Sequence, residues 1–325
     1  MKKILEQIDF LLPGLVLMII VARIFPFQEN FLPYFPMPQI TFWGVVAIFI
    51  LYGLKLSPQE MMRDLANWRL HLMAQGATYL ILPLLVLILY PFFKSSDFFD
   101  LWLALFFLAV LPSTVSMSVI FVAKNNGNLG GAIFNSSISG FLGMVITPLW
   151  MSFFLVNSSG MGDTSDLIIK LVQQIFIPII VGMTFKYFAP KTALWLLGKF
   201  KNFDKMVVML IVYNSFSNAF NRELFSMIPS SQLPILIAGV IALYLVFFEL
   251  LGFIARVLEF DRKDALVLLF CGTQKSLVHG SVFALLLFQE VEMQTLALLP
   301  LMIYHAFQLL FASYKSIVWQ NKLQR

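Results

Sequence analysis

The sequence predicts an all-α polytopic membrane protein with ten transmembrane helices, and three observations lead to this fold class. The 325 residues are 60% hydrophobic and only 12% charged, with a mean hydropathy of +0.86, which leaves too little charged surface for a water-soluble globule. Apolar stretches of roughly 20 residues, the length that spans a bilayer, recur along the whole chain. Their apolar residues run continuously, whereas a transmembrane β-barrel would require them to alternate.

The expected spans are all helices, because hydrocarbon offers any other backbone no outside hydrogen-bond partner. The first span follows Met-Lys-Lys, as in a secretory signal, but Glu6 and Asp9 interrupt the basic stretch, so we expect this span to be retained. Cys271 is the single cysteine, which excludes an intramolecular disulfide. In chain order, we place the ten spans at 10–27, 39–56, 71–92, 101–123, 131–156, 166–188, 206–221, 232–257, 264–288 and 293–317.

The distribution of lysine and arginine predicts the orientation, because these residues favour the cytoplasmic loops of membrane proteins. With a cytoplasmic N-terminus, nearly all of them fall in segments on the cytoplasmic side. The exceptions are Arg23, Lys94 and Arg222 on the opposite side, and Lys170 and Lys275 inside spans. We therefore expect both termini in the cytoplasm of an integral plasma-membrane protein, or of an inner-membrane protein if the source is bacterial.

Ten spans divide into two halves of five, and an odd number per half turns the second copy upside down relative to the first. Such inverted repeats are common in transporters. Residues 1–160 form the first expected repeat and residues 161–325 the second, separated at the linker-like stretch NSSGMGDTSD. The similarity between FLLPGLVL at 10–17 and FIPIIVGM at 176–183 is consistent with this duplication, since each carries a proline and a glycine.

Helix breakers and polar residues interrupt the fourth and ninth spans at matching places, where residues 111–118 read LPSTVSMS and residues 270–276 read FCGTQKS. Proline removes a backbone donor and glycine weakens a helix, so we expect both spans to unwind near the membrane centre. The alternative is that both are ordinary proline or glycine kinks whose freed backbone groups bond to serine and threonine. The presence of two breaks at matching positions disfavours this alternative. The candidate site residues are Pro112, Ser113, Thr114 and Ser116 at the first break, and Gly272, Thr273, Gln274, Lys275 and Ser276 at the second.

Lys275 is the most informative of these residues, because a lysine at the centre of a span costs about 2.5–3.5 kcal/mol even on permissive insertion scales. It lies about eleven residues, or roughly 16 Å, from the expected cytoplasmic end, too far for its side chain to reach the interface. We therefore expect Lys275 to face a cavity and to have a partner.

Polar residues on neighbouring spans form a second candidate site, for an ion or for substrate. Asn214 could line the same cavity or pack against a neighbouring helix. Glu249 and Arg256 are expected to pair along one helix face, and His279 and His305 to bond carbonyl groups or relay protons. The members of this second site are Gln75, Asn135, Ser136, Ser137, Ser139 and Asn214.

Machinery for catalysis is not evident in the sequence. We find no carboxylate pair, histidine-rich metal spacing, catalytic-triad order or phosphate loop, so we expect no enzyme, no cofactor, no resident metal and no nucleic-acid partner. The expected partners are the lipid bilayer and a small-molecule solute.

The motifs LPSTVSMSVIF at 111–121, KNNGN at 124–128, ITP at 146–148 and FCGTQKSLVHG at 270–280 resemble those of the sodium/bile-acid symporter superfamily. More specifically, they resemble a divergent branch described as sodium-dependent transporters. The resemblance implies a core domain of spans 3–5 and 8–10, a panel domain of spans 1, 2, 6 and 7, and broken fourth and ninth helices that cross. It also implies that the panel rocks against the core to carry an amphipathic organic anion.

The resemblance assigns approximate sodium-ligating roles, but two positions depart from it. Phe270 stands where the sodium-dependent members have a glutamate, and Lys275 where they have an asparagine. The ammonium group of a lysine could replace a bound sodium ion electrostatically. The positions that correspond to sodium ligands are Gln75, Ser116, Ser136, Ser137, Thr273 and Gln274.

The sequence therefore predicts secondary active transport of a small organic anion with little or no need for sodium. Lys275 would act either as a permanent counter-charge or as a proton carrier. The alternative is a non-transporting membrane regulator or receptor that keeps a transporter scaffold. A membrane enzyme is disfavoured by the lack of an acid–base constellation.

Overall fold

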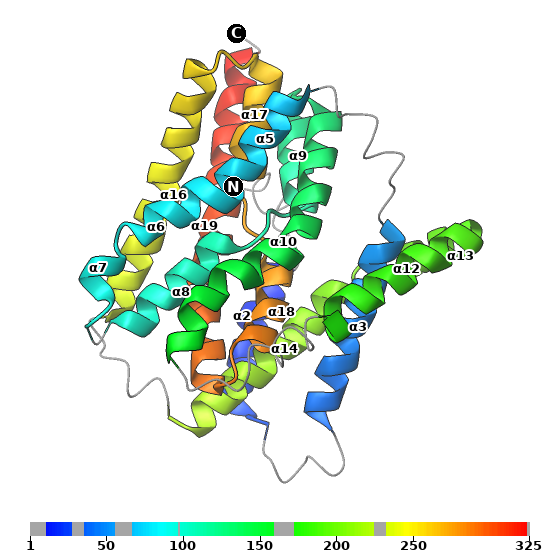
Figure 1. Ribbon diagram of the computed structural model, residues 1–325, viewed down its shortest axis with the longest axis vertical. Coiled ribbons are helices and arrows are strands. Elements are labelled where there is room, and N and C mark those ends of the chain that lie inside the picture. Colours follow the sequence, from blue (N-terminus) through cyan, green and yellow to red (C-terminus); the bar gives the residue numbers. More distant parts are fainter. Residues whose placement is uncertain are drawn as a thin grey trace.

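The computed structural model describes residues 11–27, 36–55, 67–96, 98–158, 172–223 and 232–323. Within these ranges every regular element is a helix (Figure 1). The elements in chain order are α2 Leu11–Ile24, α3 Met37–Lys55, α5 Trp68–Gly76, η3 Ala77–Ile81, α6 Leu82–Leu87, α7 Tyr90–Phe93, α8 Phe99–Val110, α9 Ser116–Lys124, α10 Leu129–Ser158, η4 Val172–Phe176, α12 Ile177–Phe188, α13 Pro190–Lys199, α14 Phe203–Asn221, α16 Gln232–Val257, α17 Arg262–Thr273, α18 Leu277–Leu287 and α19 Val291–Leu323.

The all-helical fold class is confirmed for the described residues. Five helical stretches there are long and apolar enough to cross a membrane, and three shorter apolar helices accompany them. The count of ten spans and their inverted repeat remain predictions. Most of the predicted linker at 157–166, and also Lys170, lie outside the described residues.

Helix α13 was not predicted. Its residues fall between the expected spans 166–188 and 206–221. Pro190 occupies its first turn, where the missing N–H costs nothing because that group has no helical partner in any case. Ala189 breaks the helical path between α12 and α13, with φ of −134° and ψ of 62°.

The helices pack in two groups. The smaller group contains α2, α3, α12, α13 and α14, and the larger group contains the helices from α5 to α10 and from α16 to α19. Within the smaller group, α3 and α12 meet at Gly53 and Gly182, where a Cβ atom on either residue would collide with a backbone carbonyl oxygen of the other helix. This contact therefore requires glycine at both positions.

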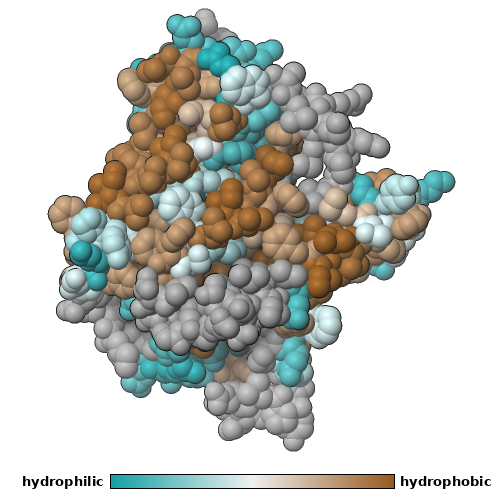
Figure 2. Space-filling model, viewed as in Figure 1, coloured by the Kyte–Doolittle hydropathy of each residue, from teal (hydrophilic) through white to brown (hydrophobic). Residues whose placement is uncertain are grey.

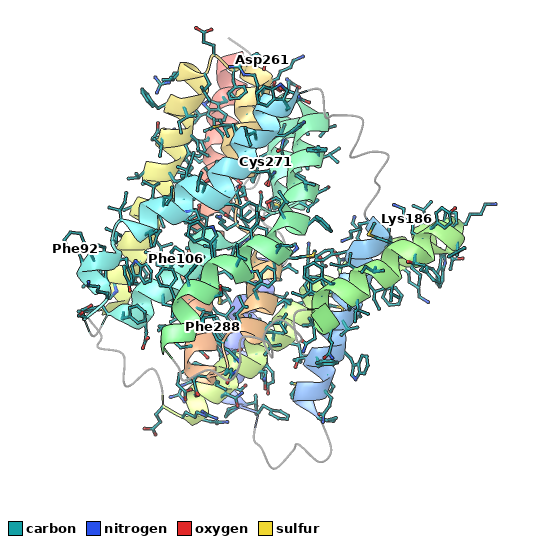
Figure 3. All side chains as sticks on the ribbon, viewed as in Figure 1. Phe92, Phe106, Lys186, Asp261, Cys271 and Phe288 are labelled. Carbon is teal, nitrogen blue, oxygen red and sulfur yellow. The ribbon has the colours of Figure 1, made fainter. Side chains whose placement is uncertain are left out.

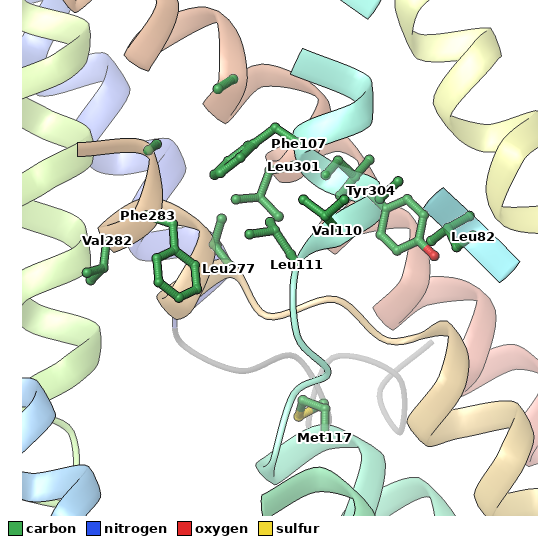
Figure 4. Packing of buried hydrophobic residues seen from close by; sticks show 14 of the residues in the cluster. Leu82, Phe107, Val110, Leu111, Met117, Leu277, Val282, Phe283, Leu301 and Tyr304 are labelled. Atoms are coloured by element: carbon green, nitrogen blue, oxygen red, sulfur yellow. The ribbon is translucent and has the colours of Figure 1, made fainter. Parts of the chain in front are cut away.

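Aromatic side chains fill one end of the larger group. Trp102 stacks on Phe106 with ring centroids 5.2 Å apart, and its indole N–H donates to the carbonyl oxygen of Val86 at 3.1 Å. Phe154 packs edge-on against both rings. Further buried apolar residues lie beside the interrupted segments of the chain, as the labelled side chains of Leu111, Leu277 and Leu301 show (Figure 4).

A network of polar hydrogen bonds connects the helices at the other end of the larger group. The carboxylate of Asp264 accepts hydrogen bonds from the side-chain amides of Asn67 and Asn128, at the starts of α5 and α10. Asp261 caps α17 by accepting from the backbone N–H of Asp264 at 2.7 Å. One carboxylate thus holds together three helix ends that are distant in sequence.

One predicted ion pair is wrong. Glu249 pairs with Lys315 of α19 at 3.6 Å, whereas Arg256 donates to the carbonyl oxygen of Gly252 on its own helix at 3.2 Å. Spacing along α16 identifies neighbours on that helix and carries no information about Lys315 on α19.

Large apolar side chains cover much of the outside, as expected for a chain solvated by lipid. Figure 2 shows broad hydrophobic patches over the helices, with hydrophilic residues gathered toward the ends. Among the exposed side chains are Ile88, Leu149, Ile235 and Val246. A water-soluble monomer rarely exposes contiguous apolar surface on this scale.

Candidate functional site

The first helix interruption separates α8 from α9. Helix α8 ends at Val110, and Leu111 is extended with φ of −71° and ψ of 151°. Pro112 causes this break, because it has no N–H for the helix ladder and its ring disfavours helical geometry at the preceding residue. Helix α9 then begins at Ser116.

The carbonyl groups at the end of α8 lose their helical partners and find others. Thr147 donates its hydroxyl to the carbonyl oxygen of Val110 at 2.7 Å. The backbone N–H of Ser276 donates to the carbonyl oxygen of Pro112 at 2.9 Å. This last bond joins the two interruptions directly, although they lie far apart in sequence.

The second interruption lies between α17, which ends at Thr273, and α18, which begins at Leu277. Gln274 is extended, with ψ of 131°. Gly272 sits at a close approach, because a Cβ atom there would lie 2.7 Å from a methyl carbon of Leu251. Its role in the structure is therefore close packing of α17 against α16.

Lys275 lies at the meeting point and is fully buried. Its ammonium nitrogen Nζ donates to the carbonyl oxygens of Ala109 and Leu111 at 2.7 Å each, and to that of Thr78 at 3.0 Å. An ammonium group has three N–H donors, so all of them are used. The first two acceptors belong to the carboxyl end of α8, where the helix dipole favours a positive charge.

The acceptor on Thr78 exists because the helix is locally widened into the π-helical turn η3. The backbone N–H of Leu82 donates to Ala77, five residues back, and so leaves the carbonyl of Thr78 without its usual partner. Pro83, the next residue, has no N–H to offer. Lys275 takes up the carbonyl that this distortion frees.

Side chains of α19 hold the backbone of the second interruption. The amide of Gln308 accepts from the N–H of Lys275 at 2.8 Å and donates to its carbonyl oxygen at 3.0 Å. Tyr304 donates its hydroxyl to the carbonyl oxygen of Thr273 at 2.7 Å. His305 bonds the Gln308 amide nitrogen through Nδ1 at 2.9 Å.

Gln308 and Tyr304 were not predicted as site residues. Gln308 could have been found from the sequence, because it is an uncharged polar residue in the middle of the apolar span 293–317. Nothing in the sequence alone indicated that Thr78, Ala109 and Leu111 would each contribute a backbone carbonyl.

The second candidate site contains a chain of polar contacts between α5 and α10. Gln75 donates its amide to the backbone and side-chain oxygens of Asn135 at 3.0 and 3.1 Å, and Asn135 in turn contacts Nδ1 of His71 at 2.9 Å. Ser136 lies 3.5 Å from the sulfur of Cys271, which Figure 3 shows inside the larger group. These contacts place Gln75, Asn135 and Ser136 close to α17.

Amide atoms of two glutamines are buried without a hydrogen-bond partner among the residues that the structure describes. Both amide atoms of Gln274 are in this state, as is the side-chain oxygen of Gln75. A buried polar atom without a partner is uncommon and costly in a protein. The unpartnered atoms of Gln274 and Gln75 are therefore positions at which water, an ion or a solute would be stabilised.

The two departures from the sodium-dependent pattern differ in their surroundings. Phe270 is fully buried and stacks on Phe121, with ring centroids 5.4 Å apart, and packs edge-on against Trp319 at 5.9 Å. An aromatic cluster thus fills the position of the missing carboxylate. The Lys275 ammonium contacts three backbone carbonyls that belong to none of the positions expected to ligate sodium.

The remaining candidate residues surround the first interruption or lie apart from it. Ser139 connects α10 to this break, since its hydroxyl accepts from the N–H of Ser113 at 3.0 Å and its carbonyl accepts from the hydroxyl of Tyr79. Thr114 contacts Ser118 at 3.2 Å. Ser276 contacts Nδ1 of His279 at 2.9 Å. Ser137 on α10 and Asn214 on α14 are both half-buried. The side chain of Ser116 lies outside the described part of the chain.

The smaller group of helices meets the larger one where α14 packs on α18 and α19, and the following side-chain contacts also cross between the groups. Tyr52 of α3 stacks on His279 of α18, with ring centroids 4.9 Å apart and an interplanar angle of 8°. Thr295 of α19 donates to the carbonyl oxygen of Ser215 on α14 at 3.2 Å. Arg222, just after α14, forms an ion pair with Glu292 at the start of α19 at 2.9 Å.

An all-helical, strongly apolar chain whose two interrupted helices meet around a buried cation has the character of an integral membrane transporter. The chain belongs to the SBF-like CPA transporter family, whose sequence profile matches residues 9–321. This family consists of transporters, so the protein is a transporter and not an enzyme.

Similar proteins occur in bacteria and vertebrates. YfeH of Escherichia coli strain K12, described as a candidate symporter, is 27% identical over 312 residues, which cover 95% of this chain and 92% of the relative. Sodium/bile acid cotransporter 7 of Danio rerio is 30% identical over 310 residues, 94% of this chain and 91% of the relative. The protein of the same name in Rattus norvegicus is 29% identical over 322 residues, 96% and 93% respectively.

Proposed function

We propose that this protein is a secondary active transporter that moves a small, amphipathic organic anion by alternating access. We further propose that Lys275 replaces a bound sodium ion as the positive charge at the centre of the site. One observation carries this proposal: the Lys275 ammonium donates to three backbone carbonyls where the two interruptions meet. Carbonyl oxygens at a broken helix are also the usual ligands of a coupling cation in transporters.

The contacts favour a permanent counter-charge over a proton carrier. All three N–H groups of Lys275 are used, and none of its acceptors is an ionisable group that could take up the proton. The backbone of Lys275 is also fixed at both polar atoms by Gln308. A group held at five points is suited to stay in place during a transport cycle.

The local charge favours an anionic substrate. Relative to the sodium-dependent pattern, a carboxylate is replaced by the neutral Phe270 and an amide by the cationic Lys275. A second monovalent cation about 4 Å from an ammonium group would be opposed by roughly 4 kcal/mol at an effective dielectric constant of 20. The names of the vertebrate relatives suggest a bile acid or a similar amphipathic anion as the substrate class.

Alternating access would come from rocking of a panel domain, spans 1, 2, 6 and 7, against a core domain of spans 3–5 and 8–10. The dense packing of α2 on α14 and of α3 on α12 supports this division, and α14 would be the helix at which the two domains meet, since it also packs on α18 and α19. The unpartnered amide of Gln274 and the unpartnered side-chain oxygen of Gln75 would supply polar surface for a bound solute to cover. The inverted repeats 1–160 and 161–325, and cytoplasmic termini in a plasma membrane, belong to the same proposal.

Uptake of radiolabelled taurocholate into proteoliposomes tests the proposal, with external sodium exchanged for potassium. The wild-type protein should transport equally in both salts, because its central charge is built in. The double variant Phe270→Glu with Lys275→Asn restores the charge pattern of the sodium-dependent members and should gain sodium dependence. Lys124→Asn, at an exposed lysine, serves as the control.

A steep sodium dependence of the wild-type protein would overturn the role of Lys275. Absence of flux for taurocholate and for a panel of smaller organic anions would overturn the transport of this substrate class. Thermal-shift screening of the same anions distinguishes a protein that binds without transporting, because a ligand stabilises the state that it selects.

A further inference from the structure

We propose that helix α13 is a docking surface for the headgroups of anionic phospholipids. This inference goes beyond the proposed function and does not depend on it. Helix α13 has ten residues, about half the length needed to span a bilayer. It follows α12 after the break at Ala189 and projects at the edge of the molecule (Figure 1).

One face of α13 packs on the protein and the other is exposed. Ala193 is the buried residue of the helix, and α12 and α3 are the helices that it contacts. The opposite face carries Lys191, Leu194, Trp195 and Lys199, all exposed. Lys191, Trp195 and Lys199 follow one another at intervals of four, and Leu194 lies three positions after Lys191, so the set projects from the same side of the helix.

The exposed face combines aromatic and basic groups. The Lys199 ammonium lies 4.8 Å from the ring centre of Trp195, so the lysine stem runs along the indole. Tyr187 and Phe188, just before α13, are 81% and 77% exposed. Aromatic rings and lysines gather in this way at the headgroup level of membranes, where one part of each side chain is apolar and the other polar.

The charge of this segment is strongly one-sided. Residues 186–205 contain five lysines and one acidic residue, Asp204. Lys191, Lys199 and Lys201 are exposed. Cationic side chains at a membrane surface are attracted to anionic lipid by about 1 kcal/mol each. Charge complementarity therefore selects the anionic phospholipid headgroup as the occupant of this face.

Native mass spectrometry of the full chain tests the inference, with phosphatidylglycerol and phosphatidylcholine of equal acyl length added in equal amounts. The wild-type protein should retain the anionic lipid preferentially. The triple variant K191Q/K199Q/K201Q should lose this preference by a factor of about five per lysine, which corresponds to ~1 kcal/mol each. The matched variant K94Q/K124Q/K263Q removes three exposed lysines elsewhere and should keep it.

Hydrogen exchange in nanodiscs with one protein copy each locates the effect. Amides of residues 190–201 should exchange more slowly with phosphatidylglycerol than with phosphatidylcholine alone. The inference fails if the wild-type protein shows no anionic preference, or if both triple variants lose it equally. It also fails if the protection is absent from these one-copy discs and appears only in discs loaded with two protein copies, because the occupant is then a second copy of the chain.

Discussion

The side-chain amide of Gln308 makes both hydrogen bonds that the backbone of Lys275 would otherwise lack. Its oxygen lies 2.8 Å from the Lys275 nitrogen, and its nitrogen lies 3.0 Å from the Lys275 oxygen. The pair exchanges N–H and C=O groups in the same way as two residues paired in an antiparallel sheet. The broken helix therefore keeps its backbone hydrogen-bonded without water.

Gln308→Met should lower the thermal stability of the protein by several degrees. It leaves a buried N–H and a buried C=O of Lys275 unsatisfied, each at a cost of about 1–3 kcal/mol. Thermal unfolding of the purified protein in detergent measures the change. Gln294→Met removes a partly buried amide that makes one bond, to the carbonyl of Phe288, and should cost less. Equal losses in the two variants would contradict the pairing argument.

Lys275→Ala should create a cavity in which a metal cation stabilises the fold. The substitution removes the ammonium and leaves the carbonyls of Thr78, Ala109 and Leu111 around the vacated position. Thermal unfolding in sodium chloride and in choline chloride should then differ, with sodium raising the midpoint of the variant only. An identical response of variant and wild type to the two salts would show that the carbonyls do not act as a cation cradle.

Asp264→Ala should destabilise the end of the larger helix group by roughly 1–3 kcal/mol, because its carboxylate bonds two buried or partly buried amides. The amides of Asn67 and Asn128 lose their common acceptor. Faster hydrogen exchange at the start of α5 and α10 would report the loss. Asp100→Ala, at an exposed position in the first turn of α8, is the control and should leave both regions unchanged.

Gly53→Ala should separate α3 from α12 and lower stability, although alanine normally favours a helix by roughly 0.5–1 kcal/mol over glycine. The added Cβ atom would collide with the backbone of α12 at Ile179 and Gly182. The comparison with Gly239→Ala isolates the effect, because nothing lies within 4 Å of a Cβ atom there. Unfolding midpoints that move in the same direction for both variants would contradict the close-contact explanation.

Cross-linking positions 222 and 292 should block uptake. Arg222 and Glu292 connect the two helix groups, so a covalent link between them would stop the relative motion that alternating access requires. Cysteines at both positions, in a Cys271→Ser background, react with a short bismaleimide, and taurocholate uptake is measured before and after reaction.

The control for this experiment links Glu249 and Lys315, which form an ion pair within the larger group. That link should leave uptake intact, because no relative motion crosses it. Full activity of the 222–292 cross-linked protein would refute rocking at this contact.

The all-helical fold could be predicted from the sequence because hydrocarbon imposes one rule on every backbone group. The position of the first interruption followed from Pro112, since proline acts locally. Gly272, in contrast, still lies within α17 and serves close packing against α16. Helix α13 escaped prediction because its ten residues lack the apolar length that identified the other helices. The effect of a single residue on the helix that contains it could therefore be predicted, whereas the short amphipathic helix α13 could not be distinguished from a loop.

The partners of the candidate site were harder to predict. Lys275 was recognised because placing a lysine in an apolar span costs free energy. Its acceptors are backbone carbonyl oxygens, which every residue type has, so the sequence did not identify them. Glu249 was assigned to Arg256, although the structure pairs it with Lys315. Sequence spacing describes neighbours within one helix, and these partners come from packing between helices.

The π-helical turn before Pro83 has a consequence for the family history of this chain. The turn frees the carbonyl of Thr78, and the ammonium group of Lys275 donates a hydrogen bond to it. Without this carbonyl, Lys275 would have only two acceptors instead of three. A lineage that lost either feature would be left with an orphaned donor or acceptor in the protein interior. Pro83 and Lys275 should therefore coevolve, because selection would tolerate each residue only together with the other.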